Sequence, residues 1–209
     1  MKALHHVGYW VDDLDAAMKQ WGKDLGVGPF QVIEHVPFDS FILTVDGHRY
    51  ESVVFDHSAA FAAWGPVVVE LGQVHAIDDR LAAAYHVAPG AVSHVSWVVP
   101  DVHKESMRLE RLGCRLINTA RSGPVSVAWH DGGPLFPHPV ELHQHNDVIA
   151  GMHDRLAALR TAGEHAVRDV LQRVLKPFQD PQAGAVTLDN TFRWVAAQRR
   201  GNARSTRPG

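Results

Sequence analysis

Two stretches of the chain share one pattern of alternating apolar and polar residues. Residues 4–11 read LHHVGYWV and residues 92–99 read VSHVSWVV, so that His6 corresponds to His94. Alternation over such a length is typical of a β-strand with one buried face. The chain therefore contains an internal repeat, and each copy is expected to begin with a strand.

A helix is expected after each of these strands. In the first copy Asp12 or Asp13 can cap the helix, and Gly26 suits its C-terminal end. Asp101 and Gly113 stand at the matching places of the second copy. Apolar residues recur at helical spacing between these limits, namely Leu14, Ala17, Met18, Trp21 and Leu25, then Val102, Leu109 and Leu112.

Strand-like runs separated by turn signals follow each helix. They cover residues 30–36, 41–45, a stretch from about residue 50, and 67–71, then 115–119, 125–129 and 140–143 in the second copy. Each copy is thus a βαβββ module. We predict an α+β fold in which paired βαβββ modules, residues 1–73 and 92–145, form a cupped mixed sheet with a linker at 74–91 between them.

The pattern changes after this paired domain, residues 1–145. Residues 146–209 are expected to form a helical C-terminal extension, with helical spacing at 148–159, 167–175 and 187–197. Its last residues, 198–209, carry four arginines and no acidic residue, which predicts a disordered basic tail.

Histidine and glutamate recur on the open face of both modules. Strand alternation places His6 and His94 opposite the helix-covered face. The segments VELGQ at 69–73 and VELHQ at 140–144 also correspond, and they place Glu70 and Glu141 on the same open face. Two imidazoles and two carboxylates can bind a divalent transition metal.

A single such histidine or glutamate is more often a polar residue on the wet side of a sheet. Random placement has little reason to repeat both types in register, so the repetition favours a metal site for one divalent ion, Ni, Co, Mn, Fe or Zn. Cys114 is the single cysteine, which excludes a cysteine-based cluster. The other histidines show no partner at an interpretable spacing, apart from His143, which lies near Glu141 and can reach a substrate.

Composition excludes several other classes of protein. The chain has 209 residues, of which 45% are hydrophobic and 21% charged, as in ordinary globular proteins. A net charge of −3 gives no basic surface for nucleic acid, and no apolar window is long enough for a membrane helix. We expect a cytoplasmic homodimer that acts on a small molecule and binds neither nucleic acid nor membrane.

The paired modules, the opening sequence LHHVGYWVDDLD and the strands VVEL and VELH resemble the vicinal oxygen chelate superfamily, the glyoxalase/bleomycin-resistance/dioxygenase fold. The resemblance covers residues 3–145 and is strongest to the branch of glyoxalase-like proteins and methylmalonyl-CoA epimerase. It implies metal ligation by a set like that of bacterial glyoxalase I, although the epimerase carries Gln where Glu70 stands. This set is His6, Glu70, His94 and Glu141.

Four protein ligands leave two positions of a six-coordinate metal open, which suits two neighbouring oxygens of one substrate. We therefore expect a lyase or isomerase, glyoxalase I-like or epimerase-like, that removes a proton next to a chelated carbonyl. The resemblance implies that Glu70 or Glu141 is the catalytic base. A ring-cleaving extradiol dioxygenase is the alternative, with Glu70 as a bystander, and a resistance-type binding protein without catalysis is a third possibility.

The residues expected to contact the substrate suggest a broad, apolar pocket. They suit a hydrophobic or aromatic carbonyl compound better than a small sugar-like molecule. They are Trp10, Val68, Ser96, Val98, Trp129 and His143.

Overall fold

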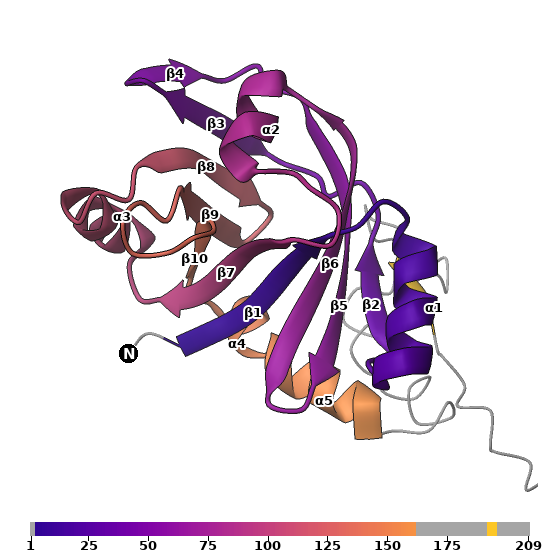
Figure 1. Ribbon diagram of the computed structural model, residues 1–209. Coiled ribbons are helices and arrows are strands. Elements are labelled where there is room, and N and C mark those ends of the chain that lie inside the picture. The colour runs from indigo at the N-terminus through magenta and orange to yellow at the C-terminus, as the bar shows by residue number, and fades with distance from the viewer. Residues whose placement is uncertain (1–2, 162–191, 196–209) are drawn as a thin grey trace, which may run out of the picture.

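The computed structural model describes residues 3–161 and 192–195. The strands of this part of the chain form one curled sheet, whose strand order is β11-β2-β5-β6-β1-β7-β10-β9-β8-β3-β4 (Figure 1). The strands are β1 (Ala3–Trp10), β2 (Phe30–Ile33), β3 (Ser40–Val45), β4 (His48–Tyr50), β5 (Phe55–Trp64), β6 (Val67–Ile77), β7 (Val92–Val99), β8 (Leu116–Ser122), β9 (Val125–His130), β10 (Val140–Gln144) and β11 (Phe192–Val195). The helices are α1 (Leu14–Leu25), α2 (Asp79–Tyr85), α3 (Val102–Arg111), α4 (Asp147–Ala150) and α5 (Met152–Thr161).

The predicted α+β fold of paired βαβββ modules is confirmed. The first module consists of β1, α1, β2, β5 and β6, and the second of β7, α3, β8, β9 and β10. Strands β1 and β7 pair antiparallel at the centre of the sheet, and each also pairs in parallel with the last strand of its own module. The two modules are therefore continuous through β1 and β7.

Both predicted helix caps are present. Asp13 accepts a hydrogen bond from the backbone of Ala16 at the start of α1, and Asp101 does the same for α3. A second link repeats as well, because the side chains of Gln73 and Gln144 accept hydrogen bonds from the first backbone N–H of α1 and of α3. Each helix is thus fastened to the strand that carries its module's glutamate.

Each module has its own apolar core on the helix-covered side of the sheet. Leu14 and Met18 of α1 pack against Val69 and Leu71 of β6, as strand alternation predicts. In the second module Leu109 of α3 packs in a cluster that includes Val140 and Leu142 of β10. The opposite face of the sheet is left for the site.

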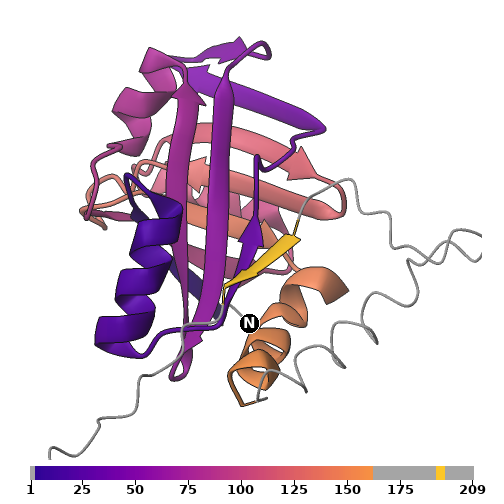
Figure 2. The same ribbon diagram turned by 90° about the vertical axis from the view of Figure 1, so that its right-hand side faces the viewer.

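The α5 helix covers part of that opposite face. Figure 2 shows α1 and α5 on opposite sides of β5 and β6. Met152, Leu156 and Leu159 of α5 are buried against Ala63 and Val68. Among the described residues, no helix combines the length and the apolar composition needed to cross a membrane.

Three expectations about individual segments were wrong. The strand at 41–45 does not join the sheet of the first module, because β3 and β4 form a hairpin that pairs with β8 of the second module. The linker at 74–91 contains the end of β6 and the helix α2. A helix was expected at 187–197, but Phe192–Val195 form β11, which pairs with β2. The predicted helix at 167–175 and the basic tail lie outside the described residues.

Replacing Leu156 with Ala should lower the free energy of unfolding of the whole molecule by about 2–4 kcal/mol, because it opens a cavity between α5 and the sheet. Denaturant unfolding followed by tryptophan fluorescence measures this, with the exposed Arg160→Ala as control. A separate transition for the C-terminal residues, with the sheet unaffected, would show that α5 is not part of the same cooperative unit.

Candidate functional site

The four predicted ligands come together at the centre of the sheet. His6 lies on β1, His94 on β7, Glu70 on β6 and Glu141 on β10, four strands that are neighbours in the order β6-β1-β7-β10. All four side chains are buried. The sequence repeat thus placed all four residues on one face correctly.

The strand register arranges these residues in two similar rows. In one row Gly8 lies between Glu70 and His94 on the neighbouring strands. In the other, Ser96 lies between His6 and Glu141. Each row thus contains an acid, a small residue and a histidine, which leaves room for the longer side chains to meet above the small one.

Gly8 is required by this close approach. A Cβ atom at this position would lie 2.2 Å from Cε1 of His94 and 2.6 Å from Oγ of Ser93, far inside contact distance. Any larger residue would therefore displace the His94 ring from the other ligands.

The distances between the ligand atoms fit a metal ion. Nε2 of His6 lies 2.7 Å from Nε2 of His94, 2.8 Å from Oε2 of Glu70 and 3.3 Å from Oε2 of Glu141. Nε2 of His94 lies 3.3 Å and 3.4 Å from the same two carboxylate oxygens. Ligands ~2.1 Å from one ion lie about 3.0–3.4 Å from each other in octahedral or tetrahedral geometry. The distances from the two nitrogens to the carboxylate oxygens are close to these values, and the two nitrogens would move apart by about 0.3 Å to bind one ion.

The electrostatics of this site favour positive charge. Burial opposes a charge on His6, but Glu70 and Glu141 outweigh it and raise the pKa of His6 to about 9. The pKa of His94 is also raised, because the two carboxylates outweigh its burial. Burial acts to raise the pKa values of Glu70 and Glu141, but nearby histidines outweigh it and lower both. The buried carboxylates therefore stay ionised and attract cations.

Two β-bulges hold the ligand histidines in place. His5 is the extra residue between the pairs Leu4–Trp97 and His6–Ser96, and Ser93 is the extra residue between two pairs at the other end. Nδ1 of His5 lies 2.7 Å from Nδ1 of His6, and Oγ of Ser93 lies 2.7 Å from Nδ1 of His94. In both modules the residue before the histidine thus occupies Nδ1 and leaves Nε2 for the centre of the site.

Strict alternation from His6 would place the neighbouring His5 on the helix-covered face, and this prediction is wrong, because His5 lies beside His6 and lines the cavity. A bulge adds one residue to a strand, so strict alternation of side chains fails at that point. Burial and the neighbouring imidazoles lower the pKa of His5 to about 2, which keeps it neutral. One feature of the sequence indicates the position that His5 takes: in the repeat it corresponds to Ser93, which has the same contact with the histidine that follows it.

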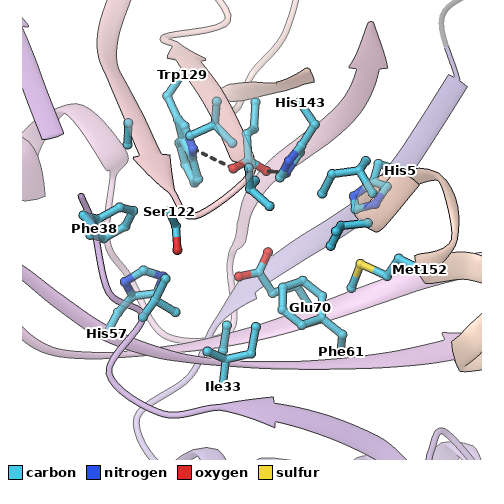
Figure 3. A pocket seen from close by; sticks show the side chains of 18 of the residues that line it. His5, Ile33, Phe38, His57, Phe61, Glu70, Ser122, Trp129, His143 and Met152 are labelled. Atoms are coloured by element: carbon cyan, nitrogen blue, oxygen red, sulfur yellow. Dashed lines mark hydrogen bonds and ion pairs between the residues drawn. The ribbon is translucent and has the colours of Figure 1, made fainter. Parts of the chain in front are cut away.

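The two carboxylates have different surroundings. Oε1 of Glu141 accepts a hydrogen bond from Nε1 of Trp129 at 2.9 Å, and its Oε2 lies 2.9 Å from Nε2 of His143. Within the described part of the chain, the hydrogen bonds and ion pairs of Glu70 involve its Oε2 alone. Glu70 points into the cavity beside Phe61 (Figure 3). Glu141 is thus fixed on both oxygens, whereas Glu70 keeps one oxygen free to face a ligand.

A cavity of about 210 Å³ has Glu70 and Glu141 in its wall, and aromatic rings form much of the rest of the wall. Phe55 stacks on His57 with ring centroids 4.2 Å apart, and Tyr85 stacks on Trp129 at 4.3 Å. Figure 3 shows Phe38 and Phe61 on two further sides of the space. The cavity therefore suits an apolar or aromatic molecule.

Of the six residues predicted to contact the substrate, Trp129 and His143 line this cavity. The other four do not. Trp10 packs on Tyr85 in the core, and Val68 is covered by α5. Ser96 is fully buried between two ligand strands, and Val98 lies near the end of β7, outside the cavity wall. Knowing which face of the sheet carries the site does not identify the residues that line the cavity, because α5 and α2 cover part of that face.

Several wall residues were missed because they lie outside the repeat. Phe38 precedes the β3–β4 hairpin, Tyr85 ends α2, and Met152 begins α5. Tyr85 donates a hydrogen bond to Oδ1 of Asn118 at 2.6 Å, which fixes its ring below Trp129. A repeat-based prediction cannot find such residues, because they reach the cavity through long-range packing alone.

The sequence profile of the Glyoxalase/Bleomycin resistance protein/Dioxygenase superfamily matches residues 5–130. None of the curated proteins is similar enough in sequence to count as a match. Among solved structures, similar ones include a hypothetical protein from Bacillus halodurans (13% identity, 70% of this chain and 96% of that chain, TM-score 0.48). Another is methylmalonyl-CoA epimerase from Mycobacterium tuberculosis (18% identity, 71% of this chain and 91% of that chain, TM-score 0.45). A third is a mutant of 4-hydroxymandelate synthase from Streptomyces coelicolor (17% identity, 68% of this chain and 38% of that chain, TM-score 0.46).

His57 gives a test of the cavity's electrostatics. Burial lowers the pKa of His57 to about 4, so between pH 6.5 and 4 the unfolded chain binds a proton here that the folded protein does not. Stability is therefore lost as the pH falls through this window. His57→Phe keeps the ring stack and removes the titration, and Nδ1 of His57 has no hydrogen-bond partner to lose.

When the pH falls from 8 to 5, we expect the free energy of unfolding of His57→Phe to rise by about 2 kcal/mol relative to that of the wild type. Denaturant unfolding with chelator present measures this. The exposed His103→Phe serves as control and should follow the wild type. Parallel stability curves for wild type and His57→Phe would contradict a neutral, buried His57.

Proposed function

Because the chain belongs to the glyoxalase/bleomycin resistance protein/dioxygenase superfamily, we propose that it is a metal-dependent lyase or isomerase. Its reaction removes a proton next to a carbonyl group of a small hydrophobic substrate. The observation that carries this proposal is the geometry of His6, Glu70, His94 and Glu141. The two histidine Nε2 atoms lie 2.7 Å apart and 2.8–3.4 Å from an oxygen of each glutamate, and both glutamates line an aromatic cavity.

The four residues fit a divalent transition metal in charge, ligand type and spacing. Their two carboxylates balance the charge of a divalent cation, and neutral imidazoles with carboxylates suit Fe, Co, Ni, Mn or Zn. When bound, such an ion supplies Lewis acidity toward two neighbouring oxygens of a substrate, which acidifies the adjacent C–H.

Of the two carboxylates, Glu70 is the better candidate for the base that accepts the substrate's proton. Trp129 and His143 hold the two oxygens of Glu141, so this residue is suited to staying in place as a ligand. Among the described residues, nothing bonds to Oε1 of Glu70, and its side chain points into the cavity, where a substrate carbon would lie (Figure 3). A carboxylate within reach of the carbon can accept the proton and return it to the same or a neighbouring atom.

The walls of the cavity orient the substrate and exclude water. The stacked pairs Phe55–His57 and Tyr85–Trp129 form apolar surfaces on which a flat or branched hydrocarbon group can lie. Arg155 of α5 also lines the cavity, and its guanidinium donates a hydrogen bond to the backbone of Val148. It offers a place for one negative charge of a substrate that is otherwise apolar.

Ring-cleaving dioxygenation remains the alternative. It needs three open metal positions and therefore requires Glu70 to be a bystander. The 2.8 Å distance between Glu70 and His6 instead supports Glu70 as a ligand, which favours proton transfer. The homodimer expected from the sequence stays a prediction.

Removing His94 should weaken binding of Co²⁺ or Ni²⁺ at the tightest site by more than 100-fold, because a direct ligand is lost. Ser93→Ala removes only the hydrogen bond to Nδ1 of His94 and should cost ~10–100-fold. Calorimetric titration measures both, with His103→Ala as an exposed control. Wild-type affinity in both His6→Ala and His94→Ala would rule out this metal site.

The reaction class can be tested by deuterium exchange. We expect the metal-loaded protein in D₂O to label, without consuming O₂, the carbon next to the carbonyl in some members of a panel of aryl and alkyl α-hydroxy ketones and 2-substituted acyl thioesters. Mass spectrometry measures the label, and an oxygen electrode with catechols tests dioxygenation.

The two carboxylates can then be separated by variants that keep their shape. Glu70→Gln should abolish exchange while metal stays bound, because the amide lacks the basicity of the carboxylate. Glu141→Gln should mainly weaken metal binding. Exchange at the wild-type rate in Glu70→Gln would remove this residue as the base, and oxygen consumption without exchange would favour the dioxygenase.

A further inference from the structure

A second group of metal-ligating side chains lies outside the cavity. His35 follows β2, Asp56 lies on β5 and His75 on β6, and their ligand atoms all lie within 4.8 Å of one another. The group borders a hollow beside the start of α1, whose lining includes Leu14 and Gln73. None of its members belongs to the metal-ligand cluster of His6, Glu70, His94 and Glu141.

The contacts within this group are already close to those of a metal site. Nδ1 of His35 lies 2.7 Å from Oδ1 of Asp56, so the proton that these atoms share occupies the place a cation would take. The ring centroids of His35 and His75 lie 4.6 Å apart. Ligands of a tetrahedral zinc ion lie about 3.4 Å from each other, so movements of up to about 1.4 Å in the side chains would bring the three ligand atoms, which lie within 4.8 Å of one another, to this spacing.

A buried hydroxyl holds both histidines in this arrangement. Ser58 is 5% exposed, and its Oγ accepts a hydrogen bond from the backbone N–H of His35 at 3.1 Å and lies 2.8 Å from Nε2 of His75. His35 also has a left-handed backbone, with φ of 48°, which is uncommon outside glycine. Ser58 thus orients the ring of His75 and the backbone of His35, and the contact with Asp56 orients the ring of His35, as in sites where neighbouring groups orient the ligands.

The charge around the hollow favours a cation. The hollow has a volume of about 310 Å³, and Asp13, Asp15 and Glu34 line it together with the two histidines. No lysine or arginine is among its lining residues in the described part of the chain. The positive end of the α1 dipole lies at the same place, and Asp13 and Asp15 offset it.

We propose that His35, Asp56 and His75 form a second divalent-metal site, of the zinc type. Two imidazoles, one carboxylate and a water molecule complete the four-coordinate shell that zinc prefers. The site is open to solvent, since His35 and His75 are exposed and Asp56 is half-buried, so the fourth position is accessible to an exchangeable ligand. It is independent of the function proposed above.

Equilibrium dialysis of the full-length, chelator-stripped protein against Zn²⁺ tests this proposal. We expect two ions per chain for the wild type, one for His35→Ala/His75→Ala and one for His6→Ala/His94→Ala. The control His48→Ala/His103→Ala removes two exposed histidines elsewhere and should still bind two. If the site at the centre of the sheet binds no zinc, His6→Ala/His94→Ala leaves the number of ions bound per chain unchanged. His35→Ala/His75→Ala still lowers that number.

Two further measurements do not depend on the folding of a double variant. In the wild type, ¹⁵N NMR should show the ring nitrogens of His35 and His75 shifting together as Zn²⁺ is added. Asp56→Asn keeps the shape of the side chain and should weaken this binding tenfold or more. An unchanged count in His35→Ala/His75→Ala, an equal loss in the control, or ring signals that do not move would overturn the proposal.

Discussion

The antiparallel pairing of β1 with β7 joins the two modules and sets the spacing of their histidines. It places Gly8 opposite His94 and Ser96 opposite His6. A slip of one residue would turn each histidine to the other face of the sheet and separate it from the glutamates. The small residues matter as much as the ligands, because a side chain at Gly8 would occupy the space of the His94 ring.

The repeat made the centre of the site predictable. Strands have a period of two, so one matched histidine and one matched glutamate suffice to define a shared face. Strict alternation failed one residue away, at His5, because a bulge breaks this period. The same repeat contains the answer in retrospect, since Ser93 is the equivalent residue and has the equivalent role.

The cavity wall was less predictable than the ligands for a physical reason. Trp10 and Val68 lie on the predicted face, yet Tyr85 and α5 cover them. Which element covers a sheet is decided by packing between distant segments, which a local pattern does not record. The hairpin β3–β4 is the clearest case, because it starts in the first module and pairs with the far edge of the second.

The division between repeated and unrepeated segments also describes how such a protein can diverge. The two histidines and two glutamates at the centre of the site come from the duplicated strands, whereas Phe38, Tyr85 and Met152 come from segments present in only one half of the fold. Mutations, insertions and deletions in those segments reshape the walls without touching the duplicated centre. Descendants of one ancestral gene can therefore exchange one substrate for another while they inherit the same reaction.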